Sequence, residues 1–422
     1  MNGRKFVAFF LMFVFTLLFL NQPPARAAVG LKFHFIRPQP NSGLLELSIS
    51  RRHHPRHKHH RVSHRLAEYS FQYRLFYNRV DGFLFHFGID VPERKTLGSG
   101  VALKLSLGYG TESKRLQYFW NFERGFFGRS LRFAPGFSVY DQTFSEDEWI
   151  ISSSFENSLA AFLLHEDFMD FYRLQGYGGY VKQNLTPYLH LKVGYYDETH
   201  SSVRRGTDWA LFGKHKKFRD NPPIQDADFR GFKGQLVLDT RDNRQTPERG
   251  WYVQLLGEYF PEAYKNALSY QRYILDFRRY QPISDGEILR FRLRLGDSRG
   301  DLPSQKWFDF GGISTLRGYR YKSFTGTQMA LANFEYFINW DEMNRYPDVP
   351  LLDMFNLILF ADAGTAWTGT DKQFKDLRPA DFSADVGIAL TNSDGRIRLN
   401  LAKRTDRSTN AMVVTFRLQQ PF

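Results

Sequence analysis

The stretch "ILRFRLRLG", from Ile288 to Gly296, alternates apolar and charged residues without a break. Successive side chains of a β-strand point to opposite faces, so an alternation of period two predicts a strand with one apolar and one charged face. The charged face holds Arg290, Arg292 and Arg294 together with Ile288, and the apolar face holds Leu289, Phe291, Leu293 and Leu295.

Similar segments recur from about residue 68 onwards, separated by turn residues, and give fifteen or sixteen candidate strands. Residues 141–175 have helical propensity and are predicted to form either a loop helix or a helix resting inside a barrel. The charged stretch from Asp197 to Phe229 is predicted to be a surface loop. The clearest further strands are residues 83–89, 101–110, 188–196, 251–260 and 273–280.

Alternation alone does not distinguish a soluble sandwich from a membrane barrel. The number of strands, the absence of long helical patterns and the aromatic residues near strand ends favour the barrel. The chain ends on Phe422, which resembles the C-terminal signal of bacterial outer-membrane barrels, although Gln420 and Pro421 depart from the usual form. Further aromatic residues near strand ends are Tyr259, Phe260, Tyr280, Trp340 and Trp367.

The N-terminus indicates export. Residues 1–27 combine a basic start, an apolar run from Phe6 to Leu20 and a small-residue cleavage pattern, which predicts a secretory signal peptide. No later apolar run is long enough for a membrane helix, and lipid admits only helices and closed barrels. We therefore predict an all-β fold, a 16-stranded antiparallel transmembrane β-barrel over residues 67–422.

Residues 28–66 form a predicted disordered, basic periplasmic segment. Residues 1–65 contain eleven Lys or Arg and one acidic residue, so most of the net charge of +13 belongs to the N-terminus and no nucleic-acid surface is expected on the barrel. A histidine cluster could bind a transition metal, but it lacks a defined ligand spacing, so a solvated basic tether is the preferred interpretation. The weak metal candidates are His53, His54, His57, His59 and His60.

Three motifs follow one another in the second half of the chain. The first is "LDTRDNRQTPERGWYVQL" (238–255), a strand, a turn and a second strand. The second is the glycine-rich "GGISTLRGYRY" (311–321), and the third is "LILFADAGTAW" (357–367).

Together the motifs resemble the bacterial surface antigen superfamily of outer-membrane barrels, the BamA/TamA-like proteins that insert or translocate other proteins. In that family a loop with "(V/I)RG(F/Y)" folds into the barrel lumen, and its arginine meets the aspartate of an "FxDxG" strand. The resemblance implies an inward-folded loop with Arg317, Gly318 and Tyr319, and a partner strand with Phe360, Asp362 and Gly364.

An arginine inside a lumen needs a carboxylate that pairs with its planar fork, and the resemblance implies that Asp362 fills this role for Arg317. Gly311, Gly312 and Gly318 would let the loop turn sharply. Two alternatives remain open: Arg317 could be a solvated loop tip, or the pair could stabilise the barrel without taking part in transport.

The first motif has a predicted structural role. Asp239 and Arg241 share one strand face, which a polar lumen accommodates, whereas Asp242, Pro247 and Gly250 belong to the predicted turn.

The chain departs from the family before the barrel. Most members carry periplasmic domains of about 75 residues each, and the forty or so residues after the signal peptide have no room for one. We therefore expect these domains to be lacking, and client capture either to be lacking, to come from a separate periplasmic partner, or to use the basic segment.

The predicted function is insertion or translocation of proteins at the bacterial outer membrane, with client polypeptides, outer-membrane lipid and lipopolysaccharide as partners. The alternative is a passive pore or a structural surface barrel with a plug loop. No enzymatic activity is expected because the "GxSxG" nucleophile motif is absent, and neither a catalytic residue nor a cofactor is predicted. The acidic run of Glu146, Asp147 and Glu148 is interpreted as a solvated loop.

Overall fold

The computed structural model describes most of the chain beyond residue 70. It also gives the backbone of residues 31–32 and 45–50. The predicted signal peptide, the five metal candidates and Phe422 lie outside the described residues, so what the sequence indicates for them stays a prediction. The described ranges are 70–91, 99–127, 131–151, 153–213, 215–261, 268–339, 355–369, 373–392, 397–406 and 412–418.

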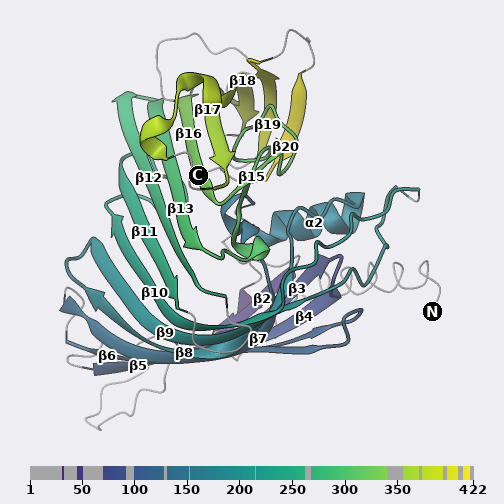
Figure 1. Ribbon diagram of the computed structural model, residues 1–422, viewed down its shortest axis with the longest axis vertical. Coiled ribbons are helices and arrows are strands. Elements are labelled where there is room, and N and C mark those ends of the chain that lie inside the picture. Colours follow the sequence, from purple (N-terminus) through teal and green to yellow (C-terminus); the bar gives the residue numbers. More distant parts are fainter. Residues whose placement is uncertain are drawn as a thin grey trace, which may run out of the picture.

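One antiparallel sheet dominates the molecule, and each strand pairs with the next along the chain (Figure 1). Within the described residues it contains sixteen wall strands, which confirms the all-β, sixteen-stranded prediction. They are β3 (Ser70–Asn78), β4 (Gly82–Val91), β5 (Ser99–Gly110), β6 (Leu116–Phe126), β7 (Phe133–Phe144), β8 (Tyr172–Asn184), β9 (Leu189–Ser202), β10 (Ala227–Asp239), β11 (Gly250–Phe260), β12 (Tyr270–Ser284), β13 (Glu287–Gly300), β16 (Gln328–Ile338), β17 (Asn356–Trp367), β18 (Ser383–Thr391), β19 (Arg398–Arg404) and β20 (Val413–Arg417).

Short elements complete the fold. Strands β1 (Leu31–Lys32) and β2 (Leu45–Ser50) precede the wall, and β14 (Phe308–Phe310) pairs with β15 (Phe324–Gly326) in a separate hairpin. No helix within the described ranges is long and apolar enough to cross a membrane. The helices within the described ranges are η2 (Asp147–Trp149), α2 (Ser154–Leu164), η3 (Ser304–Lys306), η5 (Phe374–Asp376) and η6 (Pro379–Asp381).

The sheet is polar on its inner face and apolar on its outer face. Along β13 the arginine face is buried while the leucine and phenylalanine face is only half-buried. On β20, Phe416 is 61% exposed and the neighbouring Arg417 is 4% exposed. A water-soluble protein would bury the apolar face, so this arrangement suits a sheet whose outer face contacts lipid.

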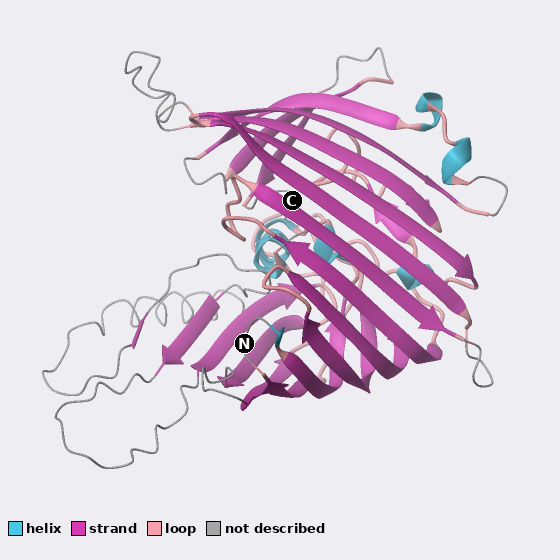
Figure 2. Cartoon of the chain, turned by 90° about the vertical axis from the view of Figure 1, so that its left-hand side faces the viewer, coloured by secondary structure: helices cyan, strands magenta, loops and turns pink. Residues whose placement is uncertain are grey.

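The three longest connections of this sheet leave from the same end. Residues 145–171, 203–226 and 301–327 are the longest, and the intervening turns at 185–188 and 285–286 are short. In bacterial outer-membrane barrels the short turns face the periplasm. The long connections fold back into the space that the curved sheet surrounds (Figure 1, Figure 2).

Two sequence predictions for these connections need correction. The surface loop predicted over Asp197–Phe229 is confirmed only for residues 203–226, because Asp197 and Phe229 lie within β9 and β10, and Phe218 of this loop is buried against Tyr77 of the wall. Glu146, treated as part of a solvated loop, accepts a hydrogen bond from Lys306 at 2.5 Å. Sequence periodicity reports which face a residue occupies and not which distant segment will supply its partner.

The first and last wall strands do not pair with each other within the described residues. β3 pairs with β4 on one side and with β2 on the other, while β20 pairs with β19. We call the place where β3 and β20 face each other the seam.

Asp276 supplies the counter-charge for two arginines of β13, Arg292 and Arg294. Its buried carboxylate accepts hydrogen bonds from Arg292 and Arg294 at 2.7 Å each and from Arg278 at 2.8 and 3.0 Å. Three guanidinium groups therefore surround one carboxylate, and their attraction outweighs the cost of burying its negative charge.

We expect Asp276→Asn to lower the free energy of unfolding by about 3 kcal/mol or more, because it leaves buried guanidinium groups without their anion. Urea unfolding in detergent, followed by tryptophan fluorescence, measures this. Asp220→Asn is the control, since Asp220 is 87% exposed. Equal stability of the two variants would contradict the role given to Asp276.

Candidate functional site

The connection from β13 to β16 folds back inside the sheet, and we call residues 304–327 the inner loop. Gly311 and Gly312 open its tight turn with φ angles of 127° and 68°. A Cβ atom on Gly311 would lie 2.6 Å from the carbonyl oxygen of Arg320, so only glycine fits there. The β14–β15 hairpin closes the base of the loop and brings Arg317 to the inner wall.

Arg317 is 1% exposed and meets two carboxylates of the wall. Its Nε and Nη2 donate to Asp362 of β17 at 2.7 Å each, and its Nη1 donates to Glu335 of β16 at 2.6 Å. The guanidinium carbon also lies 3.7 Å from the centre of the Phe360 ring. The structure thus brings together the residues of the "LRGY" and "FADAG" motifs, and it excludes a solvated loop tip.

Burial disfavours the charged form of Arg317, but Asp362 and Glu335 outweigh it and hold the pKa above its ordinary value. The bidentate geometry with Asp362 is the arrangement in which a planar guanidinium binds most strongly. The loop is therefore fixed to the wall by a charge that stays in place over the whole accessible pH range.

Three further motif residues lie where the inner loop meets the wall. Gly318 donates its backbone N–H to Asp385 of β18 at 2.9 Å, and a Cβ atom there would come within 2.8 Å of the Asp385 side chain. Tyr319 is buried, with its hydroxyl 3.3 Å from the carbonyl oxygen of Ala384. Gly364 lies in β17, where a Cβ atom would meet the Phe310 ring at 2.8 Å. All of these residues hold the loop close to the wall.

Sequence reasoning missed Glu335, Asn333 and Arg398. Arg398 of β19 donates to Glu335 at 2.8 Å, and Asn333 donates to Asp362 at 2.8 Å. Glu335 and Asn333 alternate with apolar residues in the strand before the "FADAG" motif, and this alternation was the available signal. Their pairing with Arg317 depends on the strand register.

The far side of the inner loop contacts the helical segment, residues 145–171. Lys322 lies 2.6 Å from Asp170, 2.9 Å from Asp147 and 3.3 Å from Asp309. Burial disfavours its ammonium form, but the three carboxylates outweigh it and raise the pKa of Lys322. The inner loop thus links β16–β18 to the helical segment.

The first sequence motif, residues 238–255, forms a turn between β10 and β11 at the end of the sheet that carries the short turns. Arg241 donates to Asp239 at 2.8 and 3.0 Å, and the side chain of Asp242 accepts backbone N–H groups at its own turn. Pro247 is buried and Gly250 begins β11. The motif closes a hairpin and stands apart from the Arg317 cluster.

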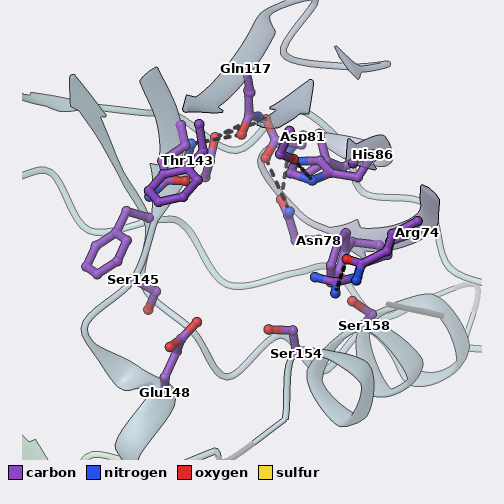
Figure 3. A pocket seen from close by; sticks show the side chains of 18 of the residues that line it. Arg74, Asn78, Asp81, His86, Gln117, Thr143, Ser145, Glu148, Ser154 and Ser158 are labelled. Atoms are coloured by element: carbon purple, nitrogen blue, oxygen red, sulfur yellow. Dashed lines mark hydrogen bonds between the residues drawn. The ribbon is translucent and has the colours of Figure 1, made fainter. Parts of the chain in front are cut away.

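A polar cavity of about 400 Å³ lies between the first wall strands and the helical segment (Figure 3). Asp81 accepts hydrogen bonds from Gln117 at 3.0 Å and Thr143 at 3.2 Å on its wall. Glu148 also lines the cavity. No cluster of metal-ligating side chains occurs in the part of the chain that the structure describes.

We expect Arg317→Lys to destabilise the protein by about 1.5–3 kcal/mol, because an ammonium group cannot replace the bidentate bond. Arg317→Ala should cost about 3–5 kcal/mol, since it leaves buried carboxylates uncompensated. Gel-shift thermal denaturation in detergent measures both. Arg320→Lys, an exposed position in the same loop, is the matched control, and equal melting of the two lysine variants would refute the assignment.

Comparisons with known proteins agree with this architecture. The Omp85 superfamily domain matches residues 95–419. The outer membrane protein assembly factor BamA of Nitratidesulfovibrio vulgaris is 24% identical over 135 residues, a match that covers 28% of this chain and 17% of that protein. This chain therefore spans only a small part of its relative's length.

Among solved structures, BamA from Haemophilus ducreyi lacking POTRA domains 1-3 matches with a TM-score of 0.53 and 15% identity, over 83% of this chain and 69% of that one. CdiB from Acinetobacter baumannii matches with a TM-score of 0.42 and 10% identity, over 83% and 59%. Omp85 barrels are assembly and transport proteins and not enzymes, in agreement with the sequence-based expectation. The chain belongs to the Omp85 superfamily and is a barrel protein of the bacterial outer membrane.

Proposed function

We propose that this protein inserts client proteins into the outer membrane and that client strands meet the barrel at the seam. The observation that carries the proposal is the strand pairing: β20 is joined to β19, and β3 is not joined to β20 within the described residues. An edge strand presents a row of backbone donors and acceptors that can template an incoming strand.

The filled interior favours insertion at the seam over transport through the middle of the barrel. The inner loop is fixed by Arg317 on one side and by Lys322 on the other, and each contact is charge-assisted. A polypeptide passing through the centre would have to break both contacts. A strand that adds to an edge leaves them in place.

In this proposal the barrel itself does not capture the client. A separate periplasmic partner would deliver the client, and the basic N-terminal segment would assist through anionic lipid or lipopolysaccharide. Recovery of a soluble periplasmic protein with the barrel from membranes under mild detergent supports this division of labour.

Depletion of the protein in its native host tests insertion. We expect the folded amounts of a subset of outer-membrane barrels to fall, because their assembly loses its template, while inner-membrane proteins stay constant. Quantitative proteomics of isolated outer membranes measures this, and a wild-type copy is the restoring control. Unchanged levels of every other outer-membrane protein would refute the proposal.

A passive pore is the second candidate, and the cavities favour it. Spaces of about 400 and 370 Å³ lie within the barrel against the helical segment. If solute passes here, Arg317→Ala should raise single-channel conductance in planar bilayers, because the inner loop loses its anchor, while barrel assembly in cells stays normal. Arg320→Ala serves as the control, and unchanged conductance excludes the pore.

A further inference from the structure

Helix α2 lies in the seam, between β20 and β3 (Figure 1, Figure 2). It begins after Ser153, whose hydroxyl accepts the backbone N–H groups of Phe155 and Glu156, and it ends at His165 in a left-handed conformation. The helix belongs to the connection between β7 and β8, which are the fifth and sixth wall strands, so it reaches the seam from another part of the wall.

The first half of α2 binds β20 from the lumen side. Glu156 accepts hydrogen bonds from Nε and Nη2 of Arg417 at 2.6 and 3.1 Å, and from the backbone N–H of Leu418 at 3.3 Å. Both side chains are at least nine-tenths buried. Arg417 also donates to Ser314 of the inner loop at 2.5 Å. The last wall strand is thus held by two segments that are not wall strands.

The second half of α2 contacts β3. Ser158 accepts the backbone N–H of Tyr77 at 3.2 Å, a donor near the outer end of that strand. Phe162 packs against the rings of Tyr77 and Phe83, with centroid distances of 5.8 and 5.9 Å. The loop from β9 to β10 covers this contact, since the Tyr77 hydroxyl donates to the carbonyl of Trp209 at 2.5 Å.

These contacts place the two halves of α2 on different sides of the wall. Tyr77 shares a strand face with Tyr73, which is 44% exposed, and Phe83 shares one with Phe85, which is 53% exposed. Phe162 therefore packs on the outward face, whereas Arg417 meets Glu156 on the inward face. Six helical residues rise about 9 Å, enough to cross a sheet.

A helix in this position is incompatible with direct pairing of β3 and β20 at the same level. Paired strands lie about 4.8 Å apart, and a helix with its side chains is about 10 Å wide. The remaining edge of β3 is covered differently: β2 pairs along it, with Leu45 opposite Leu75 and Ser50 opposite Ser70. The edge of β3 is therefore occupied by β2 from Ser70 to Leu75 and by α2 at Tyr77.

We propose that α2 is a clasp that closes the seam, joining β20 through Glu156 and β3 through Ser158 in place of strand pairing. Helix α2 must move out of the seam before any other strand can pair with the outer end of β3. The consequence for a client rests on the proposed insertion function, whereas the closure itself is a property of the chain alone.

Hydrogen exchange of the purified protein in detergent micelles, read by mass spectrometry, tests the clasp without any client. We expect Glu156→Gln to accelerate exchange in the peptide 412–418 about tenfold or more, because a charge-assisted bond to β20 is lost. Ser158→Ala should accelerate exchange in the peptide 70–78 instead. Glu166→Gln is the matched control, since Glu166 follows the same helix but pairs with the exposed Lys216.

The double variant Glu156→Arg with Arg417→Glu keeps the test informative if a single variant folds poorly. Restored protection of 412–418 in the double variant supports the pair as the closure. Wild-type protection of 412–418 in Glu156→Gln would overturn the clasp, since the strand is then held by something else. The outcome is independent of depletion experiments, so the clasp and the insertion function can fail separately.

Discussion

A buried guanidinium group must be paired with a carboxylate, and this requirement organises the interior of the barrel. The wall turns its arginines inward because its apolar side chains occupy the outer face. Asp276 compensates Arg292 and Arg294 of β13, and Glu335 compensates Arg398. The interior thus combines apolar clusters with a network of ion pairs, and removing one partner from such a network leaves a buried charge uncompensated.

The same requirement explains why the long connections fold inward. Arg317 and Lys322 leave the inner loop in opposite directions and reach carboxylates on the wall and on the helical segment. Arg417 then joins this assembly to the last wall strand through Glu156 and Ser314. Because Ser314 lies three residues before Arg317, the anchored loop and the seam are parts of one connected cluster, and a displacement of either would be felt by the other.

Much of the candidate site could be read from residue patterns, but its composition was incomplete. Arg317 and Asp362 stood out because each belongs to a recognisable motif, and the structure brings them within 2.7 Å. Glu335 contributes as directly, yet it lies in an ordinary alternating strand. The acidic run at Glu146 gave the opposite impression, of a solvated loop, because its partner Lys306 is 160 residues away.

Local alternation of apolar and charged residues determined by itself that the chain forms strands with two unlike faces, since side-chain direction in a strand follows from backbone geometry alone. Sequence also supplied the glycines of the inner loop, whose φ angles other residues rarely adopt. Only the tertiary structure decided that the charged face points inward in β13, which carboxylate each arginine meets, and that α2 occupies the seam. These outcomes depend on strand register and on contacts between segments far apart in the chain, and periodicity carries no information about either.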